Sequence, residues 1–323
     1  MRVAIVTVAN TVFGFGHYSR CKTIVQEFFS RNAKPFLFLI DSVARHIDKD
    51  LSGTTWKRGL PVPEDFDLVL FDLPEQLYRN LPWESYGKRF TVAINMFDYA
   101  DPRYEDLAFL PMDDEKQETM QMRGDCTRQY SGFQYVVINP QFFQIRKRAK
   151  KISQKANKIL ISMGGADPEN LTELAVKAIQ TIGLENNCTA IIPDDERRHD
   201  LSEIYPNIEY LGYQDNLPDV MYEYDIVIMN GGLTRYETSC LGILSIAISI
   251  HQIQYAITER WNTRHCCINA GIGAELSLEK LGGLIWDAVE DESLRRQVFE
   301  NRFTAVPENG SKKIVDIIYQ EMK

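Results

Sequence analysis

Runs of aliphatic and aromatic residues recur along the chain and alternate with segments in which apolar residues follow a helical spacing. The first run, at residues 3–8 (VAIVTV), is rich in β-branched side chains, which is typical of a strand buried on both faces of a parallel sheet. Strands that alternate with helices indicate βαβ units, so the pattern predicts an α/β fold with parallel sheets. Further strands are predicted at 36–40, 67–71, 89–95, 135–138, 158–162, 189–192, 207–211, 225–229 and 244–250, and helices at 17–31, 171–182, 217–224, 234–241, 258–270 and 312–322.

Two segments interrupt this rhythm. Residues 101–132 are charged and lack sustained apolar periodicity, which predicts an exposed insertion. Residues 145–158 form a basic run that is either a solvated linker or helix face, or a contact with an anionic surface. Because the strand and helix pattern restarts after this run, we predict domains at residues 1–150 and 151–305.

Composition narrows the class of protein. The 323 residues match the length of roughly two domains, and 44% hydrophobic with 25% charged residues is ordinary for a globular protein. The net charge of −9 argues against nucleic acid as a partner. Six cysteines without a CxxC spacing indicate reduced thiols. With no signal-peptide pattern at the start and no apolar stretch of about 18 residues, we expect a cytoplasmic protein without a transmembrane segment.

Three glycine-containing turns each follow an apolar strand and precede a helix, where open α/β sheets bind ligands. The first contains Gly14 and Gly16, which permit close approach of the backbone, followed by His17. At the start of a helix His17 could take or orient a proton near pH 7, or it could simply cap its own helix.

The second turn, at residues 162–168 (SMGGADP), contains Gly164 and Gly165. Glycines after a strand and a helix beginning at an Asp-Pro pair could form a phosphate-binding helix terminus. In the alternative interpretation this is a plain turn in which Asp167 caps the helix and Pro168 occupies its first position.

The third turn, at residues 230–237 (NGGLTRYE), contains Asn230, Gly231 and Gly232. Backbone N–H groups and Thr234 could hold a diphosphate, and the Glu237 carboxylate could accept hydrogen bonds from two ribose hydroxyls. Alternatively, Glu237 is a first-turn acid that complements the helix dipole. Two such turns in the second half favour a nucleotide site there.

Other candidates are weaker. His251 and Gln254 follow a buried strand at the end where a substrate would bind, but a solvated loop is an equal alternative. His265 with Cys266 and Cys267 could suggest a metal, yet no second His/Cys cluster has ligand spacing, so structural thiols are favoured and no metal site is predicted. The motifs GxSxG, HExxH and GxxxxGK[ST] do not occur.

Five motifs in one order resemble the family of UDP-sugar hydrolases of pseudaminic acid biosynthesis and the related spore-coat polysaccharide glycosyltransferases. More distantly, they resemble the GlcNAc transferase of peptidoglycan lipid synthesis. The resemblance covers most of residues 1–275. The motifs are GFGH at 14–17 with Arg20, FDYAD at 97–101, FQYVVINPQF at 133–142, SMGGADPENLT at 162–172 and NGGLTRYE at 230–237.

The resemblance implies a GT-B architecture, in which two Rossmann-like domains with parallel sheets face a central cleft. It also implies that the second domain binds a UDP-sugar, that no metal or other cofactor is required, and that the C-terminal helix, residues 306–323, packs back on the first domain. His17 matches the family's catalytic histidine. Gly231, Gly232, Thr234 and Glu237 match its nucleotide-binding segment, and Gly164 and Gly165 match the first turn of its second domain. We predict that Gly14, Gly16, Asn230 and Gln254 also contact the nucleotide sugar.

Two departures from the family pattern bear on the reaction. The hydrolases carry Asp-His-Tyr after the third strand, whereas Asp72 is followed here by Leu73 and Pro74. They also carry Asn-Gln where this chain has Ile253 and Gln254. We therefore predict a nucleotide-sugar-dependent GT-B glycosyltransferase of surface glycan biosynthesis, with a UDP-linked donor and a glycan, sugar or other hydroxyl acceptor. The alternatives are a UDP-sugar hydrolase that transfers to water and a non-catalytic nucleotide-sugar-binding subunit.

Overall fold

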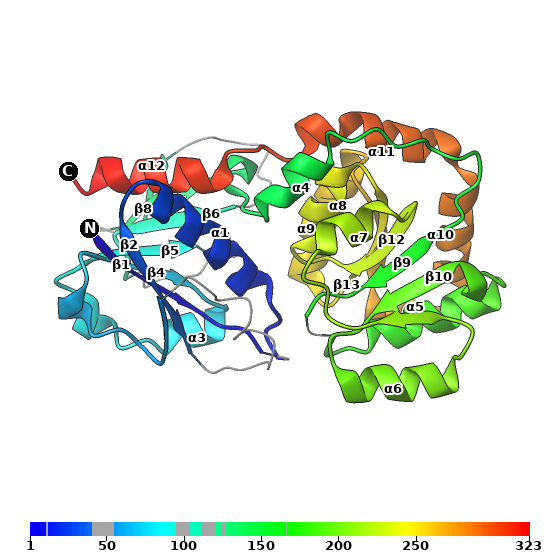
Figure 1. Ribbon diagram of the computed structural model, residues 1–323, viewed down its shortest axis with the longest axis horizontal. Coiled ribbons are helices and arrows are strands. Elements are labelled where there is room, and N and C mark those ends of the chain that lie inside the picture. Colours follow the sequence, from blue (N-terminus) through cyan, green and yellow to red (C-terminus); the bar gives the residue numbers. More distant parts are fainter. Residues whose placement is uncertain (11, 41–54, 95–103, 112–119, 124–126, 166) are drawn as a thin grey trace. The chain divides into compact units, whose positions relative to one another are not determined.

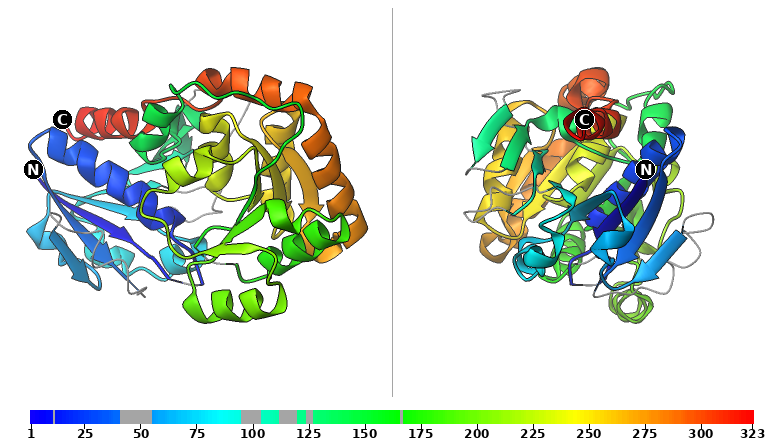
Figure 2. Two further views of the ribbon diagram at one scale, coloured as in Figure 1. Left: turned by 45° about the vertical axis from the view of Figure 1, so that its right-hand side comes forward. Right: turned by 90° about the vertical axis from the view of Figure 1, so that its left-hand side faces the viewer.

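The computed structural model describes residues 1–10, 12–40, 55–94, 104–111, 120–123, 127–165 and 167–323. The chain forms two compact units: unit 1 comprises Met1–Asn139 and Pro307–Lys323, and unit 2 comprises Pro140–Val306. The division therefore falls at Asn139–Pro140 rather than at residue 150, and the basic run lies in unit 2. Both ends of the chain lie in unit 1 (Figure 1, Figure 2).

Unit 1 is built on a sheet whose described strands have the order β3-β2-β1-β4-β5-β6-β8-β7. Neighbouring strands are parallel except β7 and β8, which are antiparallel. The chain builds outward from β1 to β3, then returns to place β4 on the other side of β1, so the strand order reverses between β1 and β4. The strands are β1 (Arg2–Thr7), β2 (Lys34–Leu39), β3 (Thr55–Arg58), β4 (Leu68–Asp72), β5 (Phe90–Ile94), β6 (Leu107–Leu110), β7 (Met120–Arg123) and β8 (Thr127–Ser131).

Both faces of this sheet are buried, as the continuous apolar run at residues 3–8 predicts. Val3 and Ile5 belong to the apolar cluster under α1 and α12, whereas Ala4 and Val6 belong to the cluster on the opposite face with Tyr78. Burial on both faces explains why the run shows no polar alternation. The helical elements of unit 1 are α1 (Gly16–Ser30), η1 (Pro63–Asp65), α3 (Glu75–Arg79), η2 (Trp83–Tyr86), η3 (Phe133–Tyr135) and α12 (Gly310–Glu321).

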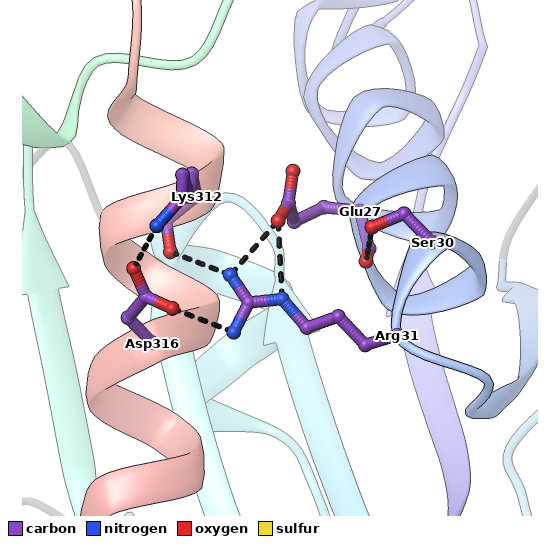
Figure 3. A network of polar contacts seen from close by, with 5 residues as sticks. All are labelled: Glu27, Ser30, Arg31, Lys312 and Asp316. Atoms are coloured by element: carbon purple, nitrogen blue, oxygen red, sulfur yellow. Dashed lines mark hydrogen bonds and ion pairs between the residues drawn. The ribbon is translucent and has the colours of Figure 1, made fainter.

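The C-terminal helix α12 lies beside α1 (Figure 1). At the end of α1, Arg31 forms ion pairs with Glu27 at 2.9 Å and with Asp316 of α12 at 2.6 Å, and it donates to the carbonyl oxygen of Lys312 (Figure 3). A Cβ atom at Gly310 would lie 1.9 Å from the carbonyl oxygen of Val136, so the first turn of α12 fits only without a side chain.

Unit 2 is built on a sheet whose described strands are all parallel, in the order β11-β10-β9-β12-β13-β14. Here the strand order reverses between β9 and β12. The strands are β9 (Ile159–Ser162), β10 (Cys188–Ile191), β11 (Glu209–Leu211), β12 (Ile226–Asn230), β13 (Leu244–Ser249) and β14 (Ile268–Ile272).

The helices of unit 2 bury apolar faces against this sheet. Val176 of α5 and Ile285 of α10 share one apolar cluster with Ile161 and Ile228 of the sheet, while α8 and α9 pack against β12, β13 and β14. No helix in the described ranges is long and apolar enough to cross a membrane. The helical elements are α4 (Pro140–Ile145), α5 (Leu171–Thr181), η4 (Glu185–Asn187), α6 (Asp195–Ile204), α7 (Leu217–Tyr222), α8 (Thr234–Leu241), α9 (Gln252–Thr263), η5 (Gly273–Glu275), α10 (Leu278–Glu290) and α11 (Glu292–Ala305).

The predicted exposed insertion at residues 101–132 is wrong where the structure describes it. Strand β6 is buried at every position, and β8 extends the sheet beyond it. A four-residue strand flanked by charged residues is too short to show periodicity, which is why the pattern missed it. Residues 101–103, 112–119 and 124–126 of this segment lie outside the described residues, as does the whole FDYAD motif at residues 97–101.

Two further predicted elements are wrong. Residues 135–138 form the end of η3 and irregular chain whose side chains are buried, because an apolar run reports burial rather than strand pairing. The helix predicted at 258–270 begins earlier, at Gln252, and ends at Thr263; β14 then occupies Ile268–Ile272. His265 adopts a φ of 54°, in the left-handed region, and so separates the helix from the strand.

The basic run at residues 145–158 forms hydrogen bonds and an ion pair within unit 2. Buried Arg146 donates to the carbonyl oxygen of Val306, Arg148 pairs with Asp219, and Lys150 donates to the carbonyl oxygen of Tyr222. Burial lowers the pKa of Lys150 to about 8, although nearby acids oppose the shift. These contacts attach Arg146, Arg148 and Lys150 to unit 2. Other cations of the run, such as Lys151 and Lys155, are exposed in irregular chain, which fits the solvated-linker interpretation.

Candidate functional site

The candidate residues gather at the two places where strand order reverses. In unit 1 the carboxyl ends of β1 and β4 lie side by side, and in unit 2 those of β9 and β12 do. Helices that leave neighbouring strands in opposite directions open a crevice at such a point, where open α/β sheets bind ligands. Each unit therefore carries one candidate site at its own switch point.

The turn after β1 is held by Asn10. Its side-chain Oδ1 accepts from the backbone N–H groups of Val12 and Phe13, and its carbonyl oxygen accepts from Gly14 N at 2.9 Å. Gly14 has a φ of 74°, which favours glycine. Helix α1 begins at Gly16, so this turn places His17 in the first turn of α1 at the switch point.

His17 contacts an acid that the sequence analysis did not assign to the site. Its Nδ1 lies 2.7 Å from Oδ1 of Asp72, the last residue of β4. Arg20, one helical turn after His17, donates from Nε at 2.8 Å and from Nη2 at 2.7 Å to the same carboxylate. Asp72 is fully buried, whereas the His17 side chain is 17% exposed. The signal in the sequence that could have identified Asp72 is its position as an acid at the end of a predicted strand, where a parallel sheet would place it near His17.

The contacts among His17, Asp72 and Arg20 indicate which ring nitrogen of His17 carries the proton. Burial raises the pKa of Asp72, but the charge and hydrogen bonds of Arg20, helped by His17, outweigh it and hold the pKa below its usual value. An ionised carboxylate only accepts, so Nδ1 of His17 donates to it. The Arg20 Nη2 atom is closer to Asp72 Oδ1, at 2.7 Å, than to Nδ1, at 3.1 Å, and so donates to the carboxylate. Neutral His17 then has its lone pair on Nε2, where it can act as a general base.

In the turn after β9, the side chain of Asp167 binds the first backbone amides of the following helix. The Asp167 carboxylate accepts from Leu171 N and Thr172 N, both at 2.8 Å, and pairs with Arg197 at 2.7 Å. These amides are the first of α5, so a carboxylate of the chain fills the place a phosphate would take. This geometry favours the interpretation in which Asp167 caps the helix. Pro168 does not occupy the first helical position, because α5 begins at Leu171.

Asn230 joins the second and third turns. Its Nδ2 donates to the Met163 carbonyl oxygen at 2.5 Å, beside Gly164, and its Oδ1 accepts from Gly232 N at 3.0 Å. Gly164 has a φ of 82°, which favours glycine, and Gly165 follows it. The structure thus brings the glycine turns of β9 and β12 together at the switch point of unit 2.

The turn after β12 leaves its helix terminus open. Gly231 N donates to the Ile248 carbonyl oxygen. Within the described ranges, no group accepts from the backbone N–H of Leu233 or Thr234. Unlike α5, α8 therefore presents unpaired amides and the positive end of its dipole, which is the requirement for binding an anion.

Glu237 lies one turn into α8 and is buried, with 7% of its surface exposed. Burial raises its pKa to about 7, and a hydrogen bond from the Thr234 side chain only partly opposes the shift. In the described part of the chain no cation forms an ion pair with Glu237. A buried carboxylate without a counter-charge is costly, and hydroxyl donors from a ligand would reduce that cost.

The remaining predicted residues are placed as follows. Gln254 lies against the third turn, since a Cβ at Gly231 would lie 2.7 Å from its Cγ, and its Oε1 accepts from Ile250 N at 2.6 Å. His251 accepts from Gln254 N and so caps α9. Cys266 and Cys267 are buried, and burial raises the pKa of the Cys267 thiol. Over the described ranges, no three His, Cys, Asp or Glu residues are grouped to hold a metal ion.

Comparison of the sequence with known proteins finds two distant relatives, and no protein-family model matches it. It is 22% identical over 219 residues to the spore coat polysaccharide biosynthesis protein SpsG of Bacillus subtilis, covering 64% of this chain and 62% of that protein. It is 21% identical over 291 residues to the uncharacterized protein MJ1062 of Methanocaldococcus jannaschii, covering 79% and 57%. The matches thus span less than two thirds of the length of either relative.

Solved structures match the whole chain. MurG of Acinetobacter baumannii superposes with a TM-score of 0.64 at 12% identity, covering 99% of this chain and 100% of that one. S. aureus MnaA, solved with UDP, gives 0.65 at 13%, covering 100% and 97%, and Anabaena Alr3699/HepE, solved with UDP and glucose, gives 0.62 at 11%, covering 98% and 99%. The resemblance to pseudaminic acid pathway hydrolases stays a prediction. The chain has a GT-B glycosyltransferase fold and is similar to a spore-coat polysaccharide biosynthesis protein, as its motifs predict.

Proposed function

We propose that this chain is a glycosyltransferase of surface glycan biosynthesis that uses a UDP-linked sugar as donor. The observation that carries the proposal is the open N-terminus of α8 beside the buried carboxylate of Glu237, which forms no ion pair with a described residue. Two structural neighbours, MnaA and HepE, were solved with UDP, which supports a nucleotide of this kind. SpsG supports a role in polysaccharide synthesis.

In this proposal α8 binds the donor. The N–H groups of Leu233 and Thr234 would donate to the diphosphate, and the Glu237 carboxylate would accept from two ribose hydroxyls. The same amides would stabilise the negative charge that grows on the diphosphate as the glycosidic bond breaks. A helix terminus can do this without a bound metal.

His17 is the proposed general base. As an acceptor oxygen bonds to the anomeric carbon, its proton passes to Nε2 of His17, and the electron pair of the breaking bond leaves with UDP. Asp72 would stabilise the imidazolium that forms and keep the ring in the orientation that directs Nε2 outward. Arg20 would hold the carboxylate in position. The proposal requires that donor and His17 meet in the predicted cleft.

Binding is tested by thermal stabilisation. A ligand at 100 times its Kd stabilises a protein by about 2.7 kcal/mol, so UDP and UDP-sugars at millimolar concentration should raise the Tm clearly. Uridine serves as the control for the contribution of the diphosphate. If no UDP compound shifts the Tm, the proposal is wrong.

Turnover separates the proposed transferase from its alternatives. UDP release that requires a hydroxyl acceptor, with the glycosylated product identified by mass spectrometry, is the expected result. Rapid UDP release without an acceptor would instead identify a hydrolase, because water can take the place of the hydroxyl. Binding without turnover across donors and acceptors would identify a non-catalytic subunit. H17A should abolish turnover while UDP affinity is kept.

A further inference from the structure

Arg235, in the first turn of α8, is a buried cation that has no counter-charge among the described residues. Its side chain is 1% exposed, and its Nε has no hydrogen-bond partner in the part of the chain that the structure describes. Its Nη1 donates to Thr258 Oγ1 at 3.4 Å, and its guanidinium carbon lies 5.1 Å from the centre of the Tyr236 ring, but no described carboxylate forms an ion pair with it. Burying a charge is costly unless it is paired, so this arrangement needs an explanation.

Three other buried arginines show how the fold normally compensates such a charge. Arg20 donates twice to the Asp72 carboxylate. Arg295, 3% exposed, donates to the carbonyl oxygens of Ala288, Val289, Ser153 and Gln154 at 2.5–2.9 Å. Arg146, 5% exposed, donates to the carbonyl oxygens of Arg302 and Val306. Arg235 donates to no carboxylate or carbonyl oxygen among the described residues, so its charge is compensated less than that of the other three.

The guanidinium lies beneath the open turn of α8. Thr258 Oγ1, its one hydrogen-bond partner in the described part of the chain, would be only 2.7 Å from a Cβ at Gly231. Gly231 is the first residue of the glycine turn that precedes the unpaired amides of Leu233 and Thr234. The cation and the open amides are thus two independent features that favour negative charge at the same turn. A charge acts more strongly through the protein interior than through water.

We propose that Arg235 is the buried counter-charge of the donor's diphosphate, an inference that rests on the proposed function. It does not touch the ligand. Its positive charge stabilises the bound diphosphate electrostatically. The bound diphosphate in turn provides the counter-charge that Arg235 lacks among the described residues. The free protein is therefore less stable with Arg235 than with an apolar side chain of similar size, and UDP binding recovers that stability.

The test compares UDP with uridine in matched variants. R235M removes the charge and keeps much of the volume, R235K keeps the charge, and R295M removes a buried arginine that donates to four carbonyl oxygens. Titration calorimetry gives the two affinities of each variant, and a thermal melt without ligand gives its Tm. In R235M we expect UDP affinity to fall about tenfold, uridine affinity to stay unchanged and the Tm to rise. R235K should keep most of the preference for UDP over uridine.

R295M should lower the Tm and leave the preference for UDP unchanged. A folded R235M protein that prefers UDP over uridine as strongly as the wild type would overturn the inference, and a lower Tm would then mark Arg235 as a packing residue. If R235M fails to fold, the ratio of UDP affinity to uridine affinity is measured in R235Q instead, with the same expected decrease. A wild-type protein that binds UDP no better than uridine would overturn the proposed diphosphate site itself, so the two failures are distinct.

Discussion

Replacing Asp72 with asparagine tests whether this buried acid supports His17 as a general base. The introduced amide can keep an oxygen toward Nδ1 of His17, so the ring keeps its orientation, but the negative charge is lost. Opposite charges about 4 Å apart attract by about 4 kcal/mol at an effective dielectric constant of 20, and Arg20 offsets part of this. We therefore expect turnover in D72N to fall about 100-fold, which corresponds to about 2.7 kcal/mol.

The same substitution should destabilise the protein. Asp72 accepts two charge-assisted hydrogen bonds from Arg20, which is 2% exposed, and the amide can keep only one of them. A hydrogen bond to a charged group contributes about 1.5–3 kcal/mol, and the remaining buried cation is no longer neutralised. The expected loss in unfolding free energy is about 3 kcal/mol, measured by denaturant unfolding.

The assay is UDP release under saturating donor and acceptor, with UDP affinity as the control. Affinity should be unchanged, because the proposed nucleotide site lies in unit 2 whereas Asp72 lies in unit 1. If His17 and Asp72 act as a unit, the double variant H17A/D72N should lose no more turnover than H17A alone. A folded D72N protein with wild-type turnover would refute the reasoning.

Four further results are expected. Only ionised Glu237 accepts two ribose hydroxyls, so with a pKa raised to about 7 UDP affinity should fall about tenfold from pH 8 to pH 6, and E237Q should bind weakly without this pH dependence. Because the pKa of Glu237 in the folded state lies above the usual 4.5, this residue should lower the free energy of unfolding as pH rises from about 4.5 to about 7. Denaturant unfolding at pH 5 and pH 8 should show a smaller decrease in E237Q than in the wild type. G310A should lower the Tm strongly, since its Cβ would meet the Val136 carbonyl oxygen at 1.9 Å, whereas R31A, which removes ion pairs of a side chain 22% exposed, should cost at most about 1 kcal/mol. Chelation with EDTA should leave donor turnover unchanged, because the α8 terminus is proposed to stabilise the leaving diphosphate; loss of activity restored by a divalent cation would contradict that role.

Local chemistry predicted much of this fold. Apolar runs such as residues 3–8 and 244–250 became buried parallel strands, because burial on both faces favours apolar side chains at most positions, with only small polar residues such as Thr7, Ser245 and Ser249 between them. Gly242 ends α8 with a φ of 70°, as expected of a glycine after a helix. Where a segment was short, as in β6, or apolar without pairing, as at residues 136–138, the pattern could not separate strand from other buried chain.

The sequence by itself determined the α/β alternation, the glycine turns and the place of His17 at the start of a helix, because these depend on side-chain spacing and local backbone conformation. Only the tertiary structure decided which turn is open. It showed that Asp167 fills the terminus of α5 and that the terminus of α8 is unfilled by any described residue. It also joined His17 to Asp72 across 55 positions and left Arg235 without a described counter-charge. These properties depend on contacts between segments far apart in the chain, and neither periodicity nor composition encodes which side chains will meet.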